Sequence, residues 1–159
     1  MTHEYLLWFA TAAYALHVLE EYEYNWRDWA RRVLKLPVEW HTFYIANAIV
    51  IVLGVCAAGI GWREPWFSLA FPALMLVNAT FFHVLPFLWT RINSPGMFTA
   101  VLLFYPVAGW VYYGAWADGV LQTRDAILST AVGATVMAYP IVLLRTKQLR
   151  FFRQDGPAS

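Results

Sequence analysis

Five long runs of apolar residues follow one another along the chain, and short polar segments separate them. The runs cover residues 5–22, 40–60, 66–89, 97–116 and 126–144. The hydrocarbon core of a bilayer, about 30 Å thick, needs roughly 20 apolar residues of helix to cross it. The pattern therefore predicts an all-α membrane protein, a bundle of five transmembrane helices forming a single domain over residues 1–159.

Residues 23–36 have a different, amphipathic pattern. Basic side chains alternate with the apolar group Trp26, Trp29, Ala30, Val33 and Leu34. This spacing predicts an interfacial helix that continues from the first run, with its apolar side toward lipid and its basic side toward headgroups. Pro37 is expected to end it, because proline cannot continue a helix.

The composition agrees with a membrane location and excludes several functions. The chain is 60% hydrophobic and 13% charged, whereas soluble domains carry about 25% charged residues. The net charge of +1 offers no basic face for nucleic acid. Cys56 is the only cysteine, which excludes disulfides within the chain, zinc sites built on cysteine, and iron–sulfur clusters. No Lys or Arg precedes the first run, so we expect a retained helix rather than a cleaved leader.

The basic residues predict the orientation. Nine fall on one side of a five-helix arrangement: Arg27, Arg31, Arg32, Lys35, Arg91, Arg145, Lys147, Arg150 and Arg153. Only Arg63 and Arg124 fall on the other side. Lys and Arg concentrate on the cytoplasmic side of membrane proteins. We therefore expect the protein in the bacterial inner membrane, with its N-terminus outside and its C-terminus in the cytoplasm.

Ionisable residues inside these runs are few and concentrated. His17, Glu20 and Glu21 share one face of the first helix at 100° per residue, and Tyr14 extends that face. His83 on the third helix lies at a depth similar to that of His17, and the same helix carries Asn78. Further polar residues in the same half are His41, Asn47, Thr99, Tyr105 and Tyr139. Because ionisable groups in a bilayer usually mark a functional site, we expect these groups to converge on one cavity open to the cytoplasm.

Imidazole and carboxylate are good ligands for zinc or iron. The predicted metal ligands are His17, Glu20, Glu21 and His83, with Glu21 or Glu20 also acting as a general base. Asn47, Asn78, Tyr14 and His41 are expected near the substrate or behind the ligands, and Arg91 beside a headgroup or a site carboxylate. No motif for an organic cofactor is present. The alternative interpretation is a hydrogen-bonded cluster that only packs helices, or a helix end rising into the headgroup layer.

The run His17-Val18-Leu19-Glu20-Glu21 near the end of the first helix resembles the HXXEE domain family of bacterial membrane proteins. The resemblance continues at Asn78…His83 and at Arg91-Ile92-Asn93-Ser94-Pro95-Gly96, over roughly residues 10–105. The family pattern has its Asn and His three residues apart, whereas four residues intervene here. A π-bulge would bring Asn78 back to the face of His83. The resemblance implies the motif but no activity.

Three functions remain open. The first is a metal-dependent enzyme, a hydrolase or an oxidoreductase, acting on a lipid-like or isoprenoid substrate. The second is a metal-free acid–base isomerase or cyclase of a sterol- or terpenoid-like substrate, similar in outline to the emopamil-binding-protein sterol isomerases but without a motif match. The third is a small carrier or proton pathway. Expected partners are membrane lipids and the substrate, and a homodimer could form through small-residue faces such as Gly54, Ala57, Ala58 and Gly61.

Overall fold

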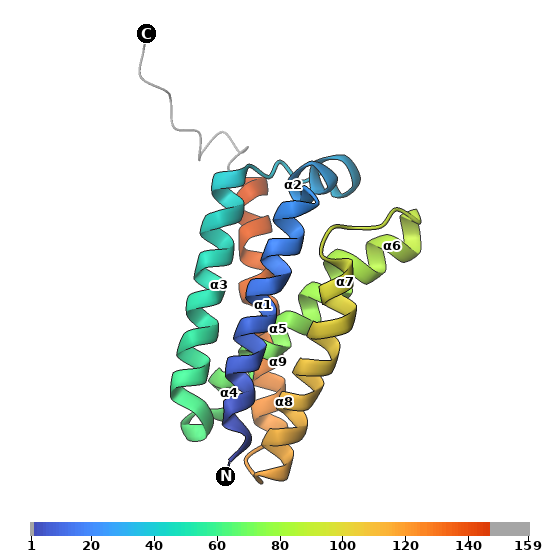
Figure 1. Cartoon of the computed structure of the whole chain (residues 1–159). Helices are drawn as coiled ribbons and strands as arrows, with labels where there is room; N and C mark the ends of the chain where they lie inside the picture. Colours follow the sequence, from blue (N-terminus) through green and yellow to red (C-terminus); the bar gives the residue numbers. More distant parts are fainter. Residues whose placement is uncertain (1, 147–159) are drawn as a thin grey trace, which may run out of the picture.

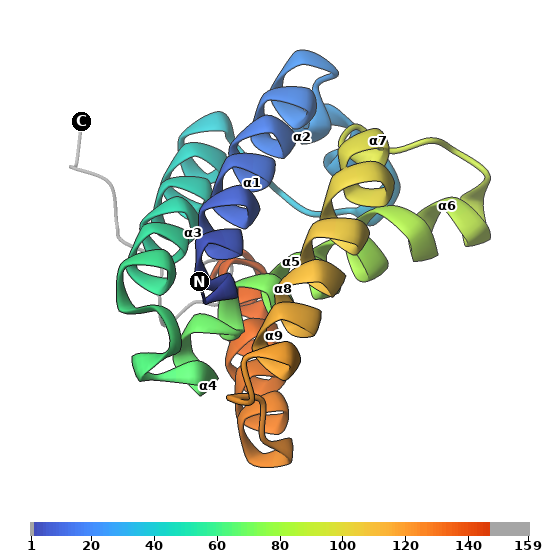
Figure 2. The same ribbon diagram turned by 60° about the horizontal axis from the view of Figure 1, so that its bottom comes forward.

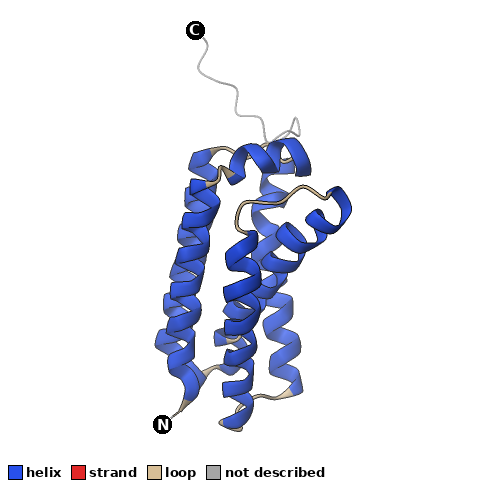
Figure 3. Ribbon diagram, turned by 45° about the vertical axis from the view of Figure 1, so that its right-hand side comes forward, coloured by secondary structure: helices blue, strands red, loops and turns tan. Residues whose placement is uncertain are grey.

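The computed structural model describes residues 2–146, which are almost entirely helical and contain no strand (Figure 3). Five helical stretches lie side by side as a bundle (Figures 1 and 2). The first, second and fifth are α1 (Leu6–Glu23), α3 (Trp40–Ile60) and α9 (Thr123–Thr146). The third comprises α4 (Pro65–Ser68), α5 (Ala70–Asn78), η4 (Ala79–Val84) and α6 (Leu85–Thr90). The fourth comprises α7 (Met97–Thr99), η5 (Ala100–Phe104) and α8 (Tyr105–Ala117).

Four of these stretches are long and apolar enough to cross a membrane: Trp40–Arg63, Pro65–Thr90, Met97–Ala117 and Thr123–Arg145. The helix α1 is not among the four, since Glu20, Glu21 and Glu23 fall within its 18 residues. It nevertheless packs lengthwise against α3 and α8 in the bundle (Figure 1). The chain is thus an all-helical protein with at least four membrane-crossing candidates.

The segment after α1 differs from the predicted interfacial helix. Asn25 adopts a left-handed conformation (φ 58°) that breaks the helix, and α2 (Trp26–Trp29) with the π-helical η2 (Ala30–Leu34) follows. The end comes at Lys35, also left-handed, before Pro37. The expectation that Trp29 and Ala30 face lipid is wrong. Both are buried, in a cluster with Leu36, Val38, Phe43 and Leu144, because the apolar side of this segment packs on the bundle.

Two π-helical segments, η4 and η5, interrupt the third and fourth stretches, and a proline follows each at the same distance. Pro86 lies two residues after η4, and Pro106 lies two residues after η5. Proline has no N–H for the carbonyl four residues earlier, and its ring collides with that carbonyl. We attribute the widened turn before each proline to this conflict. Both segments border the polar cluster described below.

The small-residue face of α3 is covered within one chain. Gly54, Ala57 and Ala58 are buried, and a Cβ at Gly54 would come within 2.7 Å of Phe71 and 2.9 Å of Thr11. The close packing predicted for this face is therefore intramolecular.

Charged groups mark the two ends of the bundle. One end of the bundle holds the α2–η2 segment, the loop after α6 and the end of α9 (Figure 1). The basic residues at this end are Arg27, Arg31, Arg32, Lys35, Arg91 and Arg145. Lys147, Arg150 and Arg153 lie outside the described residues. At the other end Asp118 joins three elements: it accepts hydrogen bonds from the backbone and ring of His3 (2.5 and 2.7 Å) and from the indole of Trp62 (2.8 Å).

Candidate metal centre

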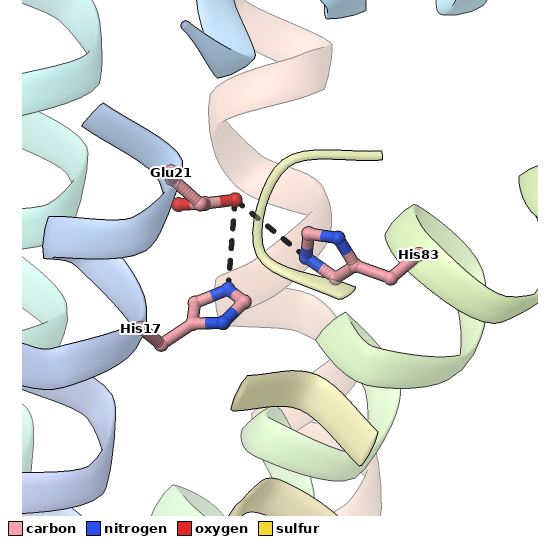
Figure 4. Close-up of side chains that lie close together, drawn as sticks. All are labelled: His17, Glu21 and His83. Atoms are coloured by element: carbon pink, nitrogen blue, oxygen red, sulfur yellow. Dashed lines mark ion pairs between the residues drawn. The ribbon is translucent and has the colours of Figure 1, made fainter. Parts of the chain in front are cut away.

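Three buried side chains meet in the half of the bundle where α1 ends. His17 and Glu21 lie one turn apart on α1, and His83 comes from η4 (Figure 4). Oε1 of Glu21 is 3.5 Å from Nε2 of His17 and 3.6 Å from Nε2 of His83. The three potential ligand atoms lie within 4.8 Å of one another. Both imidazoles are 0% exposed and Glu21 is 4% exposed. The three groups therefore form one enclosed donor set.

Two separations in this set, from Oε1 of Glu21 to Nε2 of each imidazole, suit ligands on one metal ion better than hydrogen bonds. Two atoms bound to one tetrahedral zinc at about 2.0–2.1 Å lie about 3.4 Å apart, whereas a hydrogen bond needs about 3.2 Å or less. Nε2 of His17 is buried and has no hydrogen-bond partner within residues 2–146. An unpaired buried group costs about 1–3 kcal/mol, and a cation between the three side chains would remove this cost and neutralise Glu21.

The hydrogen bond at Nδ1 of His17 determines which of its two ring nitrogens carries the proton. Nδ1 lies 2.7 Å from the hydroxyl of Thr99. That hydroxyl has one proton, and it donates to Oε2 of Glu20 at 2.6 Å. The Thr99 hydroxyl must therefore accept the hydrogen bond from His17. Nδ1 of His17 thus carries the proton, and Nε2 has a free lone pair directed at Glu21. Histidines that bind metals are oriented by just such a partner on the far nitrogen.

Glu20, although adjacent to Glu21, has a different set of contacts. Its oxygens accept hydrogen bonds from the backbone N–H groups of Gly96 (3.2 Å), Phe98 (3.1 Å) and Thr99 (2.8 Å). These donors lie at the start of α7, where N–H groups have no partner in their own helix and the helix dipole favours a negative charge. Glu20 thus holds α7 against α1 and orients Thr99, and it is not part of the three-residue donor set.

The π-helical segment η4 places the side chain of Asn78 in contact with the cluster. Its Oδ1 lies 3.1 Å from Nε2 of His83, five residues later. A π-helix brings residues i and i+5 together, so η4 places Asn78 beside His83 despite their longer spacing in this chain. Nδ1 of His83 is 2.9 Å from the hydroxyl of Ser94, which orients this ring as Thr99 orients the other.

The loop between α6 and α7 covers the cluster. Ser94 and Gly96 are buried, and Gly96 has a φ of 90°. A Cβ at Gly96 would lie 2.7 Å from Cε1 of both His17 and His83 and 2.9 Å from Cγ of Glu21. Only glycine fits this backbone conformation and this approach. The sequence predicted Ser94 and Gly96 only as part of a turn motif. Their contacts with the cluster could have been expected because the turn joins two helices that border it.

The remaining predicted site residues divide into two groups. Tyr14 donates a hydrogen bond of 2.8 Å to Oδ1 of Asn47, deeper in the bundle. His41 is exposed and contacts the hydroxyl of Thr42, and Arg91 is exposed at the end of α6. Tyr139 is 57% exposed. The structure therefore brings Tyr14 and Asn47 near the cluster, and leaves His41, Arg91 and Tyr139 on the outside of the bundle.

Two hollows lie beside the cluster. An open one of about 930 Å³, partly lined by Glu20, Arg32, Ser94 and Thr99, lies between the α2–η2 segment and the loop before α7. A narrow, mainly apolar one of about 70 Å³ is lined by residues of α1, α3, α5 and α9, and Glu21 and Asn78 form part of its wall. The first hollow carries charged and polar side chains beside apolar ones, whereas the second has few polar groups.

Residues 8–111 match a protein family described as "Protein of unknown function with HXXEE motif". The chain is also similar to the uncharacterized protein YrkK of Bacillus subtilis (strain 168), with 26% identity over 148 residues that cover 88% of this chain and 93% of that protein. No solved structure matches. The matched range contains His17, Glu20, Glu21, Asn78, His83 and the turn 91–96, and it exceeds half of the chain. The protein therefore belongs to the HXXEE family.

Proposed function

We propose that the protein is a metal-dependent membrane enzyme in which His17, Glu21 and His83 bind one zinc or iron ion. The observation that carries this proposal is the buried, unpartnered Nε2 of His17, which faces Glu21 at 3.5 Å. Two imidazoles and one carboxylate are a donor set used by catalytic zinc and by non-haem iron, and they leave a coordination position for water or substrate.

A bound ion in this position would supply Lewis-acid activation of water or of a substrate oxygen, in a hydrolase or an oxidoreductase. The residues of the chain orient and enclose it. Thr99 and Ser94 hold the two imidazoles from behind, and Gly96 packs closely against both imidazoles. Asn78 lies close enough to hydrogen-bond a substrate oxygen beside His83.

We propose a lipid-like substrate because the mainly apolar hollow beside the donor set has Glu21 in its wall. The reacting end of such a molecule would reach Glu21 from the apolar side. Water or a polar co-reactant would come through the hollow beside Glu20 and Thr99.

We further propose that α1 is a fifth span in the inner membrane, with the N-terminus outside. The support is the alignment of α1 with four apolar stretches and the basic residues at the end of the bundle that holds the cluster. In a chain with Cys56→Ser, a cysteine at exposed Gln122 should react with an impermeant maleimide on intact cells. A cysteine at exposed Asn93 should react only after lysis, and the reverse result would invert the orientation.

Elemental analysis of protein purified in mild detergent tests the function. We expect about one equivalent of zinc or iron, lost in His17→Ala and in His83→Ala because each removes one of three ligands. His41→Ala, which removes an exposed imidazole, is the matched control and should keep the metal. Equal metal content in all four proteins would refute the site.

The metal-free acid–base isomerase is the second candidate, and one contact favours it. Oδ1 of Asn78 is an acceptor, so Nε2 of His83 at 3.1 Å would be its proton donor, and a protonated nitrogen cannot bind a metal. The ring and Glu21 would then exchange protons with the substrate. Activity that survives complete chelation and is lost in Glu21→Gln would select this alternative.

A further inference from the structure

The apolar hollow beside the cluster has the form of a slot between α3 and α9. On α3 it is lined by residues in the spacing i, i+1, i+4, i+5 and i+8: Thr42, Phe43, Ala46, Asn47 and Val50. On α9 the residues from Val136 to Leu144 that line it follow the same spacing. This spacing is one face of a helix, and eight residues extend over about 12 Å at 1.5 Å per residue. Two matched helix faces therefore form the long walls.

Few direct contacts hold these two walls together. The helix α9 packs mainly against α5, and α3 packs mainly against α1. Pro140 lies in the α9 wall and cannot donate a backbone hydrogen bond to the carbonyl of Val136, one turn earlier. The α9 wall thus lacks one backbone hydrogen bond at the level of the slot, where few contacts join it to α3.

Polar groups are placed along this apolar slot. Glu21 and Asn78 lie on the cluster side, and the hydrogen-bonded pair Tyr14–Asn47 lies farther along the wall. Trp26 also lines the slot, and its indole N–H is buried without a hydrogen-bond partner among residues 2–146. A buried unpaired N–H is costly, so an acceptor on a bound molecule would be stabilising at this place.

We infer that the slot binds the single apolar chain of a lipophilic alcohol or carbonyl compound, which enters from the bilayer between α3 and α9 with its oxygen toward Glu21 and Asn78. The resting volume of about 70 Å³ holds little more than two waters at about 30 Å³ each. Binding therefore requires the two helices to move apart. A single chain needs the smallest separation, and for this reason we assign it rather than a two-chain lipid. The inference rests on the proposed function for the orientation of the polar end.

The test is photolabelling of the full chain in nanodiscs with a long-chain primary alcohol that carries a diazirine on its chain. We expect mass spectrometry to find the label on slot residues such as Ala46 and Val136, and an excess of unlabelled alcohol to suppress it. Ala46→Trp should abolish slot labelling by filling the slot. Ala48→Trp, on the exposed side of the same helix, is the matched control and should not.

Three outcomes would overturn the inference. Label confined to exposed residues such as Ala48 would mean lipid around the bundle only. Slot labelling that unlabelled alcohol does not compete, or that persists in a folded Ala46→Trp protein, would mean that the slot is not a binding site. If Ala46→Trp does not fold, the label map and the competition in the unchanged chain decide. The metal content of the same samples separates the two proposals. A labelled slot in protein without metal contradicts only the metal-dependent enzyme. Bound metal without slot labelling contradicts only the lipid site.

Discussion

Two adjacent glutamates of one motif have separate tasks in this protein. Consecutive residues of a helix point about 100° apart, so Glu21 is directed at the two imidazoles while Glu20 is directed at the start of α7. Glu20 accepts three backbone hydrogen bonds and a fourth from the hydroxyl of Thr99. Through Thr99 it determines which nitrogen of His17 carries the proton. It is a positioning residue, whereas Glu21 belongs to the donor set.

Glutamine substitutions should separate these tasks. Glu20→Gln loses the charge at the helix start, and hydrogen bonds to charged groups contribute about 1.5–3 kcal/mol. It should therefore lower thermal stability while much of the metal stays bound. Glu21→Gln should lower metal content instead, because an amide is a weaker ligand than a carboxylate. Glu23→Gln, at an exposed position, should change neither. Melting temperature and elemental analysis measure the two effects, and loss of metal only in Glu20→Gln would reverse the assignment.

At the scale of elements, the hydrophobic pattern predicted the all-helical class, while local geometry decided the details of the site. The face shared by His17, Glu20 and Glu21 follows from helical periodicity alone. The contact between Asn78 and His83 does not, because an apolar run does not show where a turn widens from α to π. The family pattern provided the signal, through the longer spacing between Asn78 and His83 in this chain. The packing of Trp29 on the bundle was missed because an amphipathic segment has the same pattern whether it faces lipid or protein.

The loop before α7 is the element most sensitive to change. Gly96→Ala adds a Cβ within 2.9 Å of all three cluster residues, and a left-handed conformation costs other residues about 1–2 kcal/mol. We expect a lower melting temperature together with loss of metal. Gly59→Ala is the matched control, since a Cβ there would have no neighbour within 4 Å in the described part of the chain. It should leave metal unchanged, and wild-type behaviour of Gly96→Ala would show that the loop does not close on the cluster.

At the scale of the whole molecule, the contacts of Asp118 connect the N-terminus, the α3–α4 turn and the end of α8, far from the cluster. Hydrogen bonds from the backbone and the ring of His3 lower the pKa of Asp118 from 3.8 to about 2. A lowered carboxyl pKa stabilises the folded state above the unfolded pKa, and this stability is lost as the pH falls through the folded pKa. Thermal stability should therefore decrease between about pH 4 and pH 2 through this group.

Asp118→Asn should remove this part of the pH dependence. The variant should be less stable than the wild type at neutral pH, and the difference should narrow as the pH falls toward 2. Melting curves of the two detergent-purified proteins across this range measure it. A difference that stays constant with pH would mean that the carboxylate charge of Asp118 contributes nothing to the fold.

The helix with the most acidic residues in the described part of the chain, α1, supplies two of the three donors of the cluster, His17 and Glu21. The same glutamates that lower the hydropathy of α1 are the groups that contact His17, His83 and the start of α7. A metal ion would offset the cost of burying Glu21, so the proposal that α1 is a span and the proposal of a bound ion are linked.

Anomalous X-ray diffraction tests that link most directly. Crystals of the full chain, prepared with zinc or with iron and measured at the matching absorption edge, should show one strong peak between the three side chains. For zinc the peak should lie about 2.0–2.2 Å from Nε2 of His17, Nε2 of His83 and a carboxylate oxygen of Glu21. Well-ordered side chains with no peak between them, or a peak only at an exposed residue such as His41, would contradict the metal centre.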